Sequence, residues 1–390
     1  VIDSSCPINQ IISPAVTPSQ KRNIVVIVEE SFGARYVESL GGDPIDPELE
    51  KLKKEGWWFE RLYATGHRSV RGLEAITASY PPGPLASQVK LDHREELTTL
   101  SSIYKKLGYK TSFIYGGESH FDSMRSYFLN NGVDRIIEQK DFKDPEYVAS
   151  WGVSDEELFK KANEEFVNLS KKGEPFCSVV FSSSFHDPFD IPQGKVNING
   201  VKTNDPKRLT AAKYADYALG KFFLQAKKED YYRNTVFLVI ADHDSRVRGI
   251  GGFPLTNYSI PALIISPDVT PHIDKRIVSQ IDILPTLLSL TGVSGEFPLS
   301  GQDLTRNDII ERAPVSYNEI FGYVKDDKLT LLIPGTAPLF FKIGKHNTIS
   351  KNDSLSMKDL PVSVSALNLG IQIYNNNFQR FSCIKALKQE

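Results

Sequence analysis

Carboxylates and an imidazole follow two short apolar runs of this sequence. Glu29-Glu30 comes directly after the run 23–28, and Asp242-His243-Asp244 comes directly after the run 235–241. A buried charge without a partner is costly, and a divalent cation would compensate it. Glu, Asp and His are suitable ligands for Mg²⁺, Mn²⁺ or Zn²⁺. Two strand ends whose charged residues face the solvent would explain these residues as well as a metal site would. Both interpretations therefore stay open at this point.

A serine lies between two arginines in the glycine-bounded loop 66–72. Ser69 precedes a helix that we expect to begin near Val70, and the N-terminus of a helix favours an anion. Arg68 and Arg71 flank the serine and can offset phosphate charge. A metal bound to the Ser69 oxygen would lower the pKa of the hydroxyl and make it a nucleophile. The simpler alternative is that Ser69 caps the helix, and one residue can do both.

Two histidines accompany these groups. His186 lies in the turn 182–188, directly after the apolar run 176–181, and it could donate to a phosphate oxygen or protonate a leaving group. His67 adjoins the Ser69 loop. For each histidine a purely structural role is the alternative.

Apolar runs of this kind are typical of strands that are buried on both faces of a parallel sheet. They alternate with segments of helical spacing, for example 155–172 and 207–228, which predicts a three-layer α/β/α sandwich. The alternation fades near residue 301, where 329–333 and 339–343 indicate antiparallel strands. We therefore expect a lead-in or linker over 1–22, a catalytic domain over 23–300 and a small C-terminal α+β subdomain over 301–390.

Composition excludes several classes of protein. The 390 residues carry 46 Lys and Arg against 48 Asp and Glu, without the basic excess of a generic nucleic-acid binder. No run of the sequence qualifies as a transmembrane helix. Cys177 lies in an apolar run and is expected to be buried, whereas a disulfide between Cys6 and Cys383 is open from the sequence.

From about Asn23 to about Asp303 the chain resembles the lipoteichoic acid synthase family, which belongs to the sulfatase and alkaline phosphatase-like superfamily. The resemblance rests on five segments that occur in the order expected for that family: VVIVEESFGARYVESLGG, LYATGHRSVRGLEAITASYPP, SSSFHDPF, VIADHDSRVRG and QIDILPTLLSLTG.

The resemblance implies a metal centre and a nucleophile. Glu30 matches the first metal-ligand carboxylate of the family, and Asp242 and His243 match its Asp-His metal pair. Ser69 matches the nucleophile, which is usually threonine and is also a metal ligand. Serine keeps the hydroxyl and loses only the methyl group that restricts the rotamer.

The resemblance also implies a phosphate-binding set. His186 matches a histidine that holds the substrate phosphate, and Arg125 lies near the family's phosphate-binding arginine. Arg68 and His67, beside the nucleophile, are further candidates for substrate binding. Two-metal relatives carry Asp four residues before the histidine; here that residue is Ser182, which favours a single divalent ion, Mn²⁺ or Mg²⁺ ahead of Zn²⁺.

The family's activity gives the expected function. Its members are membrane-anchored enzymes whose extracytoplasmic domain moves phosphoglycerol, or a related phospho-alcohol, from a phospholipid to a glycan or polymer. A formylglycine sulfatase is not expected, because the residues after Ser69 lack the x-Pro-x-Arg pattern. We expect a monomer on the periplasmic or extracellular face of the membrane, with any anchor upstream of Val1. Hydrolysis by the same site, or non-catalytic binding of a lipid or partner, is the alternative.

Overall fold

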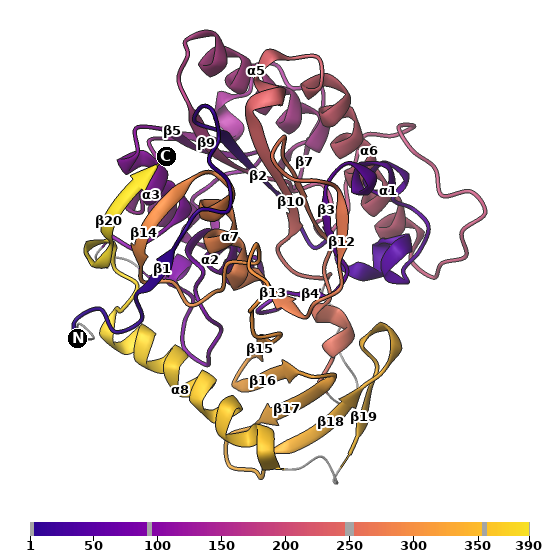
Figure 1. Cartoon of the computed structure of the whole chain (residues 1–390). Helices are drawn as coiled ribbons and strands as arrows, with labels where there is room; N and C mark the ends of the chain where they lie inside the picture. Colours follow the sequence, from indigo (N-terminus) through magenta and orange to yellow (C-terminus); the bar gives the residue numbers. More distant parts are fainter. Residues whose placement is uncertain (1–3, 92–95, 246–252, 353–356, 390) are drawn as a thin grey trace.

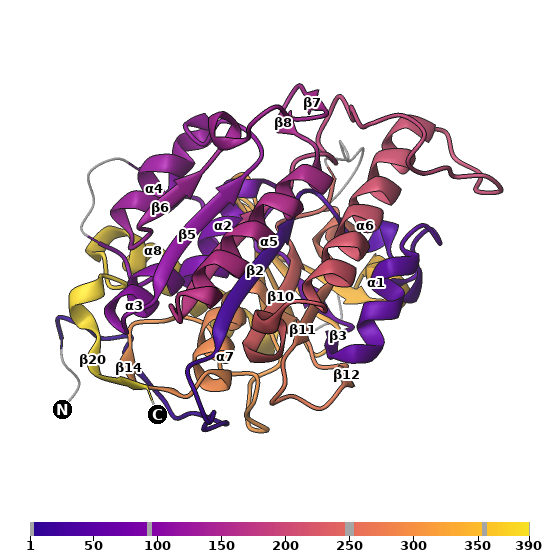
Figure 2. The same cartoon turned by 90° about the horizontal axis from the view of Figure 1, so that it is seen from above.

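The computed structural model describes residues 4–91, 96–245, 253–352 and 357–389. Its centre is an eight-stranded sheet with both faces covered by helices (Figures 1 and 2). In spatial order the strands are β12 (His272–Asp274), β3 (Trp57–Phe59), β11 (Ala262–Ile265), β10 (Thr235–Ala241), β2 (Asn23–Glu29), β9 (Phe176–Phe181), β5 (Lys110–Tyr115) and β6 (Arg135–Ile137).

The sheet is mixed rather than wholly parallel. β10, β2, β9, β5 and β6 run parallel to one another, whereas β11 is antiparallel to both β10 and β3. β2, β9 and β10 are buried along their whole length, as their continuous apolar runs predict. The parallel strands therefore end at one edge, which is where ligands bind in open α/β sheets.

Helices form the outer two layers, which confirms the predicted α/β/α sandwich. Figure 2 shows α5 and α6 lying across one face of the sheet and α2 and α7 beneath the other. One layer holds α1 (Pro47–Leu52), α5 (Asp155–Lys171) and α6 (Pro206–Ala226); the other holds α2 (Ser69–Ala78), α3 (Leu100–Lys106), α4 (Met124–Asn130) and α7 (Ile283–Leu290).

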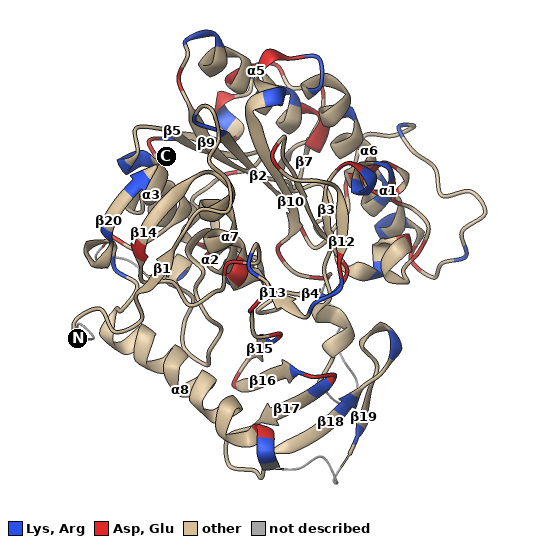
Figure 3. Cartoon of the chain, viewed as in Figure 1, with Lys and Arg blue, Asp and Glu red and all other residues tan. Residues whose placement is uncertain are grey.

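A second, antiparallel sheet follows residue 300, as the sequence predicts. It contains β15 (Ala313–Tyr317), β16 (Ile320–Lys325), β17 (Lys328–Leu332), β18 (Leu339–Ile343) and β19 (Ile349–Lys351) in that order. The helix α8 (Leu360–Asn376) packs beside β16 and β17 and carries no charged residue (Figure 3). An apolar cluster that includes Tyr63 and Tyr258 joins this sheet to the larger unit.

The two ends of the described chain meet on a third sheet. β1 (Gln10–Ile12) and β20 (Lys385–Gln389) pair with opposite edges of β14 (Val293–Phe297). A disulfide joins Cys6 to Cys383 beside this sheet, and Cys177 is buried with a free thiol. The segment 1–22 was expected to be a lead-in or linker, but its strand is part of a sheet. Two short pairs complete the strands: β4 (Leu62–Tyr63) with β13 (Val278–Ser279), and β7 (Val148–Ala149) with β8 (Gly152–Val153).

Within the described residues, none of the helices combines the length and the apolar character that a bilayer crossing requires.

Candidate active site

Two carboxylates and one imidazole meet where β2 and β10 end. The two strands are parallel and Glu29 pairs with Ala241, so the next residues, Glu30 and Asp242, leave the sheet side by side. His243 Nε2 lies 3.6 Å from Glu30 Oε1 and 3.3 Å from Asp242 Oδ2. One ligand atom of each residue lies within 4.8 Å of the others, which is a spacing that suits one metal ion.

Burial makes this arrangement costly without a cation. Glu30, Asp242 and His243 are at most 4% exposed, and no lysine or arginine of the described residues pairs with either carboxylate. Burial, and then the charge of Glu30, raises the pKa of Asp242 well above its ordinary value. Asp242 Oδ2 also has no hydrogen-bond partner. The residues present therefore fit a divalent ion, which would supply the missing charge and occupy the unpartnered oxygen.

The histidine is oriented for the same purpose. His243 Nδ1 lies 2.6 Å from the carbonyl oxygen of Asp244. A carbonyl only accepts, so Nδ1 carries the ring proton and Nε2 presents its lone pair to the carboxylates. Metal-binding histidines are commonly held in this way.

Ser69 joins the cluster from a third element. It is the first residue of α2, and its Oγ lies 3.1 Å from Glu30 Oε2 and 3.3 Å from His243 Nε2. The N-cap position belongs to Arg68, without a side-chain capping bond, so Ser69 is not the cap that the alternative required. Its hydroxyl instead faces the carboxylate and the imidazole at a helix N-terminus.

Three polar residues hold the cluster, a role not expected for them from the sequence. Ser182 Oγ accepts the Glu30 N–H at 2.9 Å and donates to Glu29 Oε2. Ser31 donates its N–H to Asp242 Oδ1 at 2.8 Å and its hydroxyl to Glu30 Oε1. Gln280 donates to the carbonyls of Ala241 and Asp242. A signal existed only for Gln280, an amide at the start of a very apolar segment.

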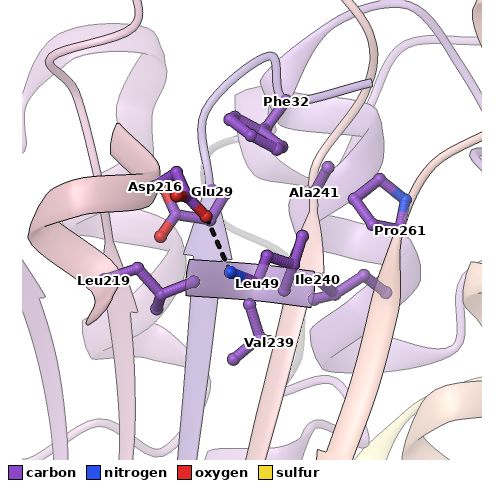
Figure 4. Close-up of a pocket in the computed structure, with 9 residues that line it drawn as sticks. All are labelled: Glu29, Phe32, Leu49, Asp216, Leu219, Val239, Ile240, Ala241 and Pro261. Carbon is purple, nitrogen blue, oxygen red and sulfur yellow. Dashed lines mark hydrogen bonds between the residues drawn. The ribbon is translucent and has the colours of Figure 1, made fainter. Parts of the chain in front are cut away.

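Glu29 faces away from the cluster of Glu30, Asp242 and His243. Figure 4 shows its carboxylate beside Asp216 at a small internal cavity, with Asp216 accepting the Leu49 N–H. Burial, and then the charge of Asp155, raises the pKa of Glu29 well above its ordinary value. Of the two adjacent carboxylates, only Glu30 therefore belongs to the cluster.

The four candidates for substrate binding each contact residues outside the cluster. Arg68 pairs with Asp122 at 3.7 Å, and its buried Nε has no hydrogen-bond partner. Arg125 pairs with Glu138 at 3.0 Å. The ring of His67 packs on Tyr317, with centroids 4.6 Å apart. The fourth candidate, His186, lies in the turn after β9, where its Nδ1 bonds the carbonyl oxygen of Asp187 at 2.8 Å.

Arg71, the second arginine that flanks the serine, points elsewhere. It pairs with Glu74 at 2.8 Å and donates to the carbonyls of Gly83 and Leu85. Its expected part in offsetting phosphate charge is therefore not supported, because the guanidinium is already engaged.

Comparison with known proteins places this geometry in a family. The sequence profile of the Sulfatase family matches residues 22–293. The chain belongs to the sulfatase family. A crystal structure of an alkaline phosphatase superfamily protein from Vibrio parahaemolyticus is similar to it, with a TM-score of 0.91 and 42% identity over 97% of this chain and 92% of that one.

This sulfatase-family chain is also similar to curated lipoteichoic acid synthase-like and phosphoglycerol transferase proteins. The lipoteichoic acid synthase-like protein YvgJ of Bacillus subtilis is 24% identical over 78% of this chain and 53% of its own length. Phosphoglycerol transferase I of Xanthomonas campestris strain B100 is 25% identical over 78% of this chain and 46% of its own length. The resemblance to this group of enzymes is therefore confirmed, although the chain spans only about half the length of these relatives.

Proposed function

We propose that the chain is a metal-dependent phosphotransferase that moves phosphoglycerol, or a similar phospho-alcohol, from a phospholipid to a glycan or polymer. The observation that carries this proposal is the position of Ser69 Oγ, 3.1 Å from Glu30 Oε2 and 3.3 Å from His243 Nε2, at the N-terminus of α2. The names of the curated relatives support the choice of phosphoglycerol.

Glu30, Asp242, His243 and the Ser69 oxygen would hold one divalent ion, Mn²⁺ or Mg²⁺. That ion would lower the pKa of the Ser69 hydroxyl and offset charge on the phosphate oxygens. The unpartnered Nε–H of Arg68 and the N-terminus of α2 then remain to orient the phosphate. Arg125 on α4 and His67 in the loop before α2 are further binding candidates.

The reaction has two displacements. In the first, Ser69 gives its hydroxyl proton to solvent, its oxygen bonds to phosphorus, and the bond from phosphorus to the diacylglycerol oxygen breaks. That oxygen takes the Nε2 proton of His186, which enters the step as an imidazolium, because Nδ1 keeps its own proton in the hydrogen bond to the Asp187 carbonyl. In the second, His186 regains a proton from an acceptor hydroxyl, the acceptor oxygen bonds to phosphorus, and the Ser69 oxygen leaves and is reprotonated.

The disulfide supports the proposed location. Disulfides such as Cys6–Cys383 persist in oxidising compartments, which agrees with a periplasmic or extracellular domain. We include in the proposal that the enzyme acts as a monomer and reaches the membrane through a segment outside residues 1–390.

Intact-protein mass spectrometry tests the covalent step. The protein is loaded with Mn²⁺ and incubated with phosphatidylglycerol but no acceptor, and peptide mapping should find one glycerophosphoryl group on Ser69. Ser69→Ala should form no adduct, Ser69→Thr should form it, and Ser126→Ala, an exposed serine on α4, serves as the matched control.

The same experiment separates the alternatives. Release of free glycerol phosphate at a rate that acceptors do not change would indicate a hydrolase. An adduct on another residue, or the absence of any adduct with each of Mn²⁺, Mg²⁺ and Zn²⁺, would refute Ser69 as the nucleophile. His186→Ala should lower turnover by about 10²–10⁴-fold with the metal content unchanged.

A further inference from the structure

Aromatic side chains cluster at the carboxyl edge of the sheet, next to the proposed phosphate site. Trp151 lies between two other rings: Phe121 at a centroid distance of 4.9 Å and His186 at 4.1 Å. Phe121 is 44% exposed and Trp151 is half-buried, so the cluster reaches the surface. An exposed apolar patch beside a reaction centre is typical of a ligand-binding surface.

The fold fixes the orientation of the indole. Trp151 lies at the tip of the β7–β8 hairpin, and its Nε1–H donates to the carbonyl oxygen of Asp187 at 2.6 Å. The hairpin packs tightly against the end of β5, because a Cβ on Gly152 would lie 2.6 Å from the Cα of Gly117. Trp151 therefore bridges the ends of the neighbouring strands β5 and β9 in a preorganised position.

The aromatic cluster is also tied to the nucleophile loop. Phe121 is followed by Asp122, which pairs with Lys90 at 2.8 Å and with Arg68 at 3.7 Å. β5 is two strands from β2, whose last residue, Glu29, precedes Glu30, and two strand spacings correspond to about 10 Å. A molecule on the aromatic cluster would therefore lie on the order of 10 Å from the cluster of Glu30, Asp242 and His243.

We propose that Trp151 and Phe121 form the acceptor subsite and stack against the apolar face of a neutral sugar ring. This inference rests on the proposed function and adds the position and chemistry of the acceptor. A pyranose has an apolar C–H face and an edge of hydroxyl groups, so it needs an aromatic surface with hydrogen-bonding groups around it.

The surroundings of the cluster supply these groups. Asp187 is exposed beside Trp151, and Asp190 accepts from Ser150 and from Lys207, both at 3.0 Å. A lipid acyl chain would leave this polar rim without hydrogen bonds, and the exposed carboxylate of Asp187 disfavours an anionic headgroup. The rim therefore favours a sugar over a lipid.

Tryptophan fluorescence gives a binding test that is independent of turnover. The chain has three tryptophans, and Trp57 and Trp58 are at most 3% exposed, so a ligand-dependent change reports on Trp151. Titration of the metal-loaded protein with cellotriose and with maltotriose should give a saturable change with at least one of them. Phe121→Ala should weaken that binding roughly three- to tenfold, Phe121→Tyr should preserve it, and Leu224→Ala, 62% exposed on α6, is the control.

Kinetics then tests the role in transfer, with phosphatidylglycerol as donor and the bound oligosaccharide as acceptor. Phe121→Ala and Trp151→Ala should each raise the acceptor KM about tenfold and raise the donor KM by less. Trp151→Phe should have an acceptor KM close to that of wild type. No saturable change with either sugar, a rise in the donor KM alone, or a spectral shift with phosphatidylcholine vesicles instead of sugar would each overturn the inference. Sugar binding without any Ser69 adduct would refute the proposed function and leave the sugar subsite intact.

Discussion

Gly72 on α2 lies directly against the backbone of Asp242. A Cβ atom at residue 72 would stand 2.7 Å from the Asp242 Cα and 2.8 Å from its carbonyl carbon. No side chain fits between these two segments. This close approach brings the first turn of α2, and with it Ser69, to the end of β10.

Gly72→Ala should therefore disturb the site although Gly72 is neither a proposed metal ligand nor the nucleophile. The methyl group pushes α2 away from β10, so we expect a loss of about 1–3 kcal/mol in the free energy of unfolding and a large loss of Mn²⁺ affinity. Calorimetric titration and thermal unfolding measure these effects. Gly83→Ala is the matched control, since a Cβ there meets nothing within 4 Å. Equal behaviour of the two variants would contradict the packing argument.

Ser182→Ala should weaken metal binding without removing a ligand. The hydroxyl accepts the Glu30 N–H and donates to Glu29, so its loss leaves two buried groups unpaired and frees the Glu30 backbone. We expect Mn²⁺ affinity to fall roughly ten- to hundredfold. The control is Ser183→Ala, because Ser183 contacts Asp155 through its backbone N–H. Unchanged affinity in Ser182→Ala would show that Glu30 is held by other contacts.

Asp242→Asn should have opposite effects on stability with and without metal. Without metal, the variant removes a charge that burial and Glu30 disfavour, so its unfolding midpoint should lie a few degrees above wild type. With saturating Mn²⁺ the order should reverse, because the wild type alone keeps the full ligand set. A metal ion at 100 times its Kd raises the free energy of unfolding by about 2.7 kcal/mol. Scanning calorimetry before and after chelation checks this. A metal-loaded variant as stable as metal-loaded wild type would exclude Asp242 as a ligand.

Two buried carboxyls between α1 and α6 should make stability depend on pH. Burial raises the pKa of Asp46 to about 8 and of Asp216 to about 7. Since both exceed the ordinary value of 3.8, the native state binds more protons than the unfolded state between about pH 4 and pH 8. Stability should therefore fall as pH rises through this window, by about 4–6 kcal/mol per group.

Urea unfolding at about pH 5, 7 and 9 measures this dependence. Asp46→Asn should flatten the profile, since the amide does not titrate, whereas Asp308→Asn, an exposed carboxylate, should leave it unchanged. A profile that rises with pH in wild type would refute the direction of both pKa shifts.

Much of the fold was predictable because its central strands are continuous apolar runs. The strands 176–181 and 235–241 have the predicted bounds, and the helix 155–172 differs by one residue at its C-terminus. The meeting of Glu30 with Asp242 and His243 follows from two parallel strands that end at one edge. The antiparallel direction of β11 was not predictable, because an apolar run carries no sign of its orientation.

Contacts between distant segments account for what the sequence did not reveal. β1 is three residues long and pairs with β14 about 280 positions away, so no local periodicity indicates it. In the sequence, Ser182 shows only that the aspartate of two-metal relatives is missing. Its hydrogen bonds to Glu29 and Glu30 form because β9 lies beside β2 in the fold. Trp151 is a single aromatic residue in the turn of a hairpin whose strands are two residues long, where no periodic pattern marks it.

The disulfide at the joined ends determines how the protein responds to force. Cys6 and Cys383 are 377 positions apart, yet their Cα atoms lie 5.6 Å from each other. Tension applied at the two ends passes through this covalent bond, and the sheets between the cysteines carry none of it. Stretched in an optical trap, the oxidised chain should release only its short terminal tails. Reduction should expose up to about 1,300 Å of hidden length.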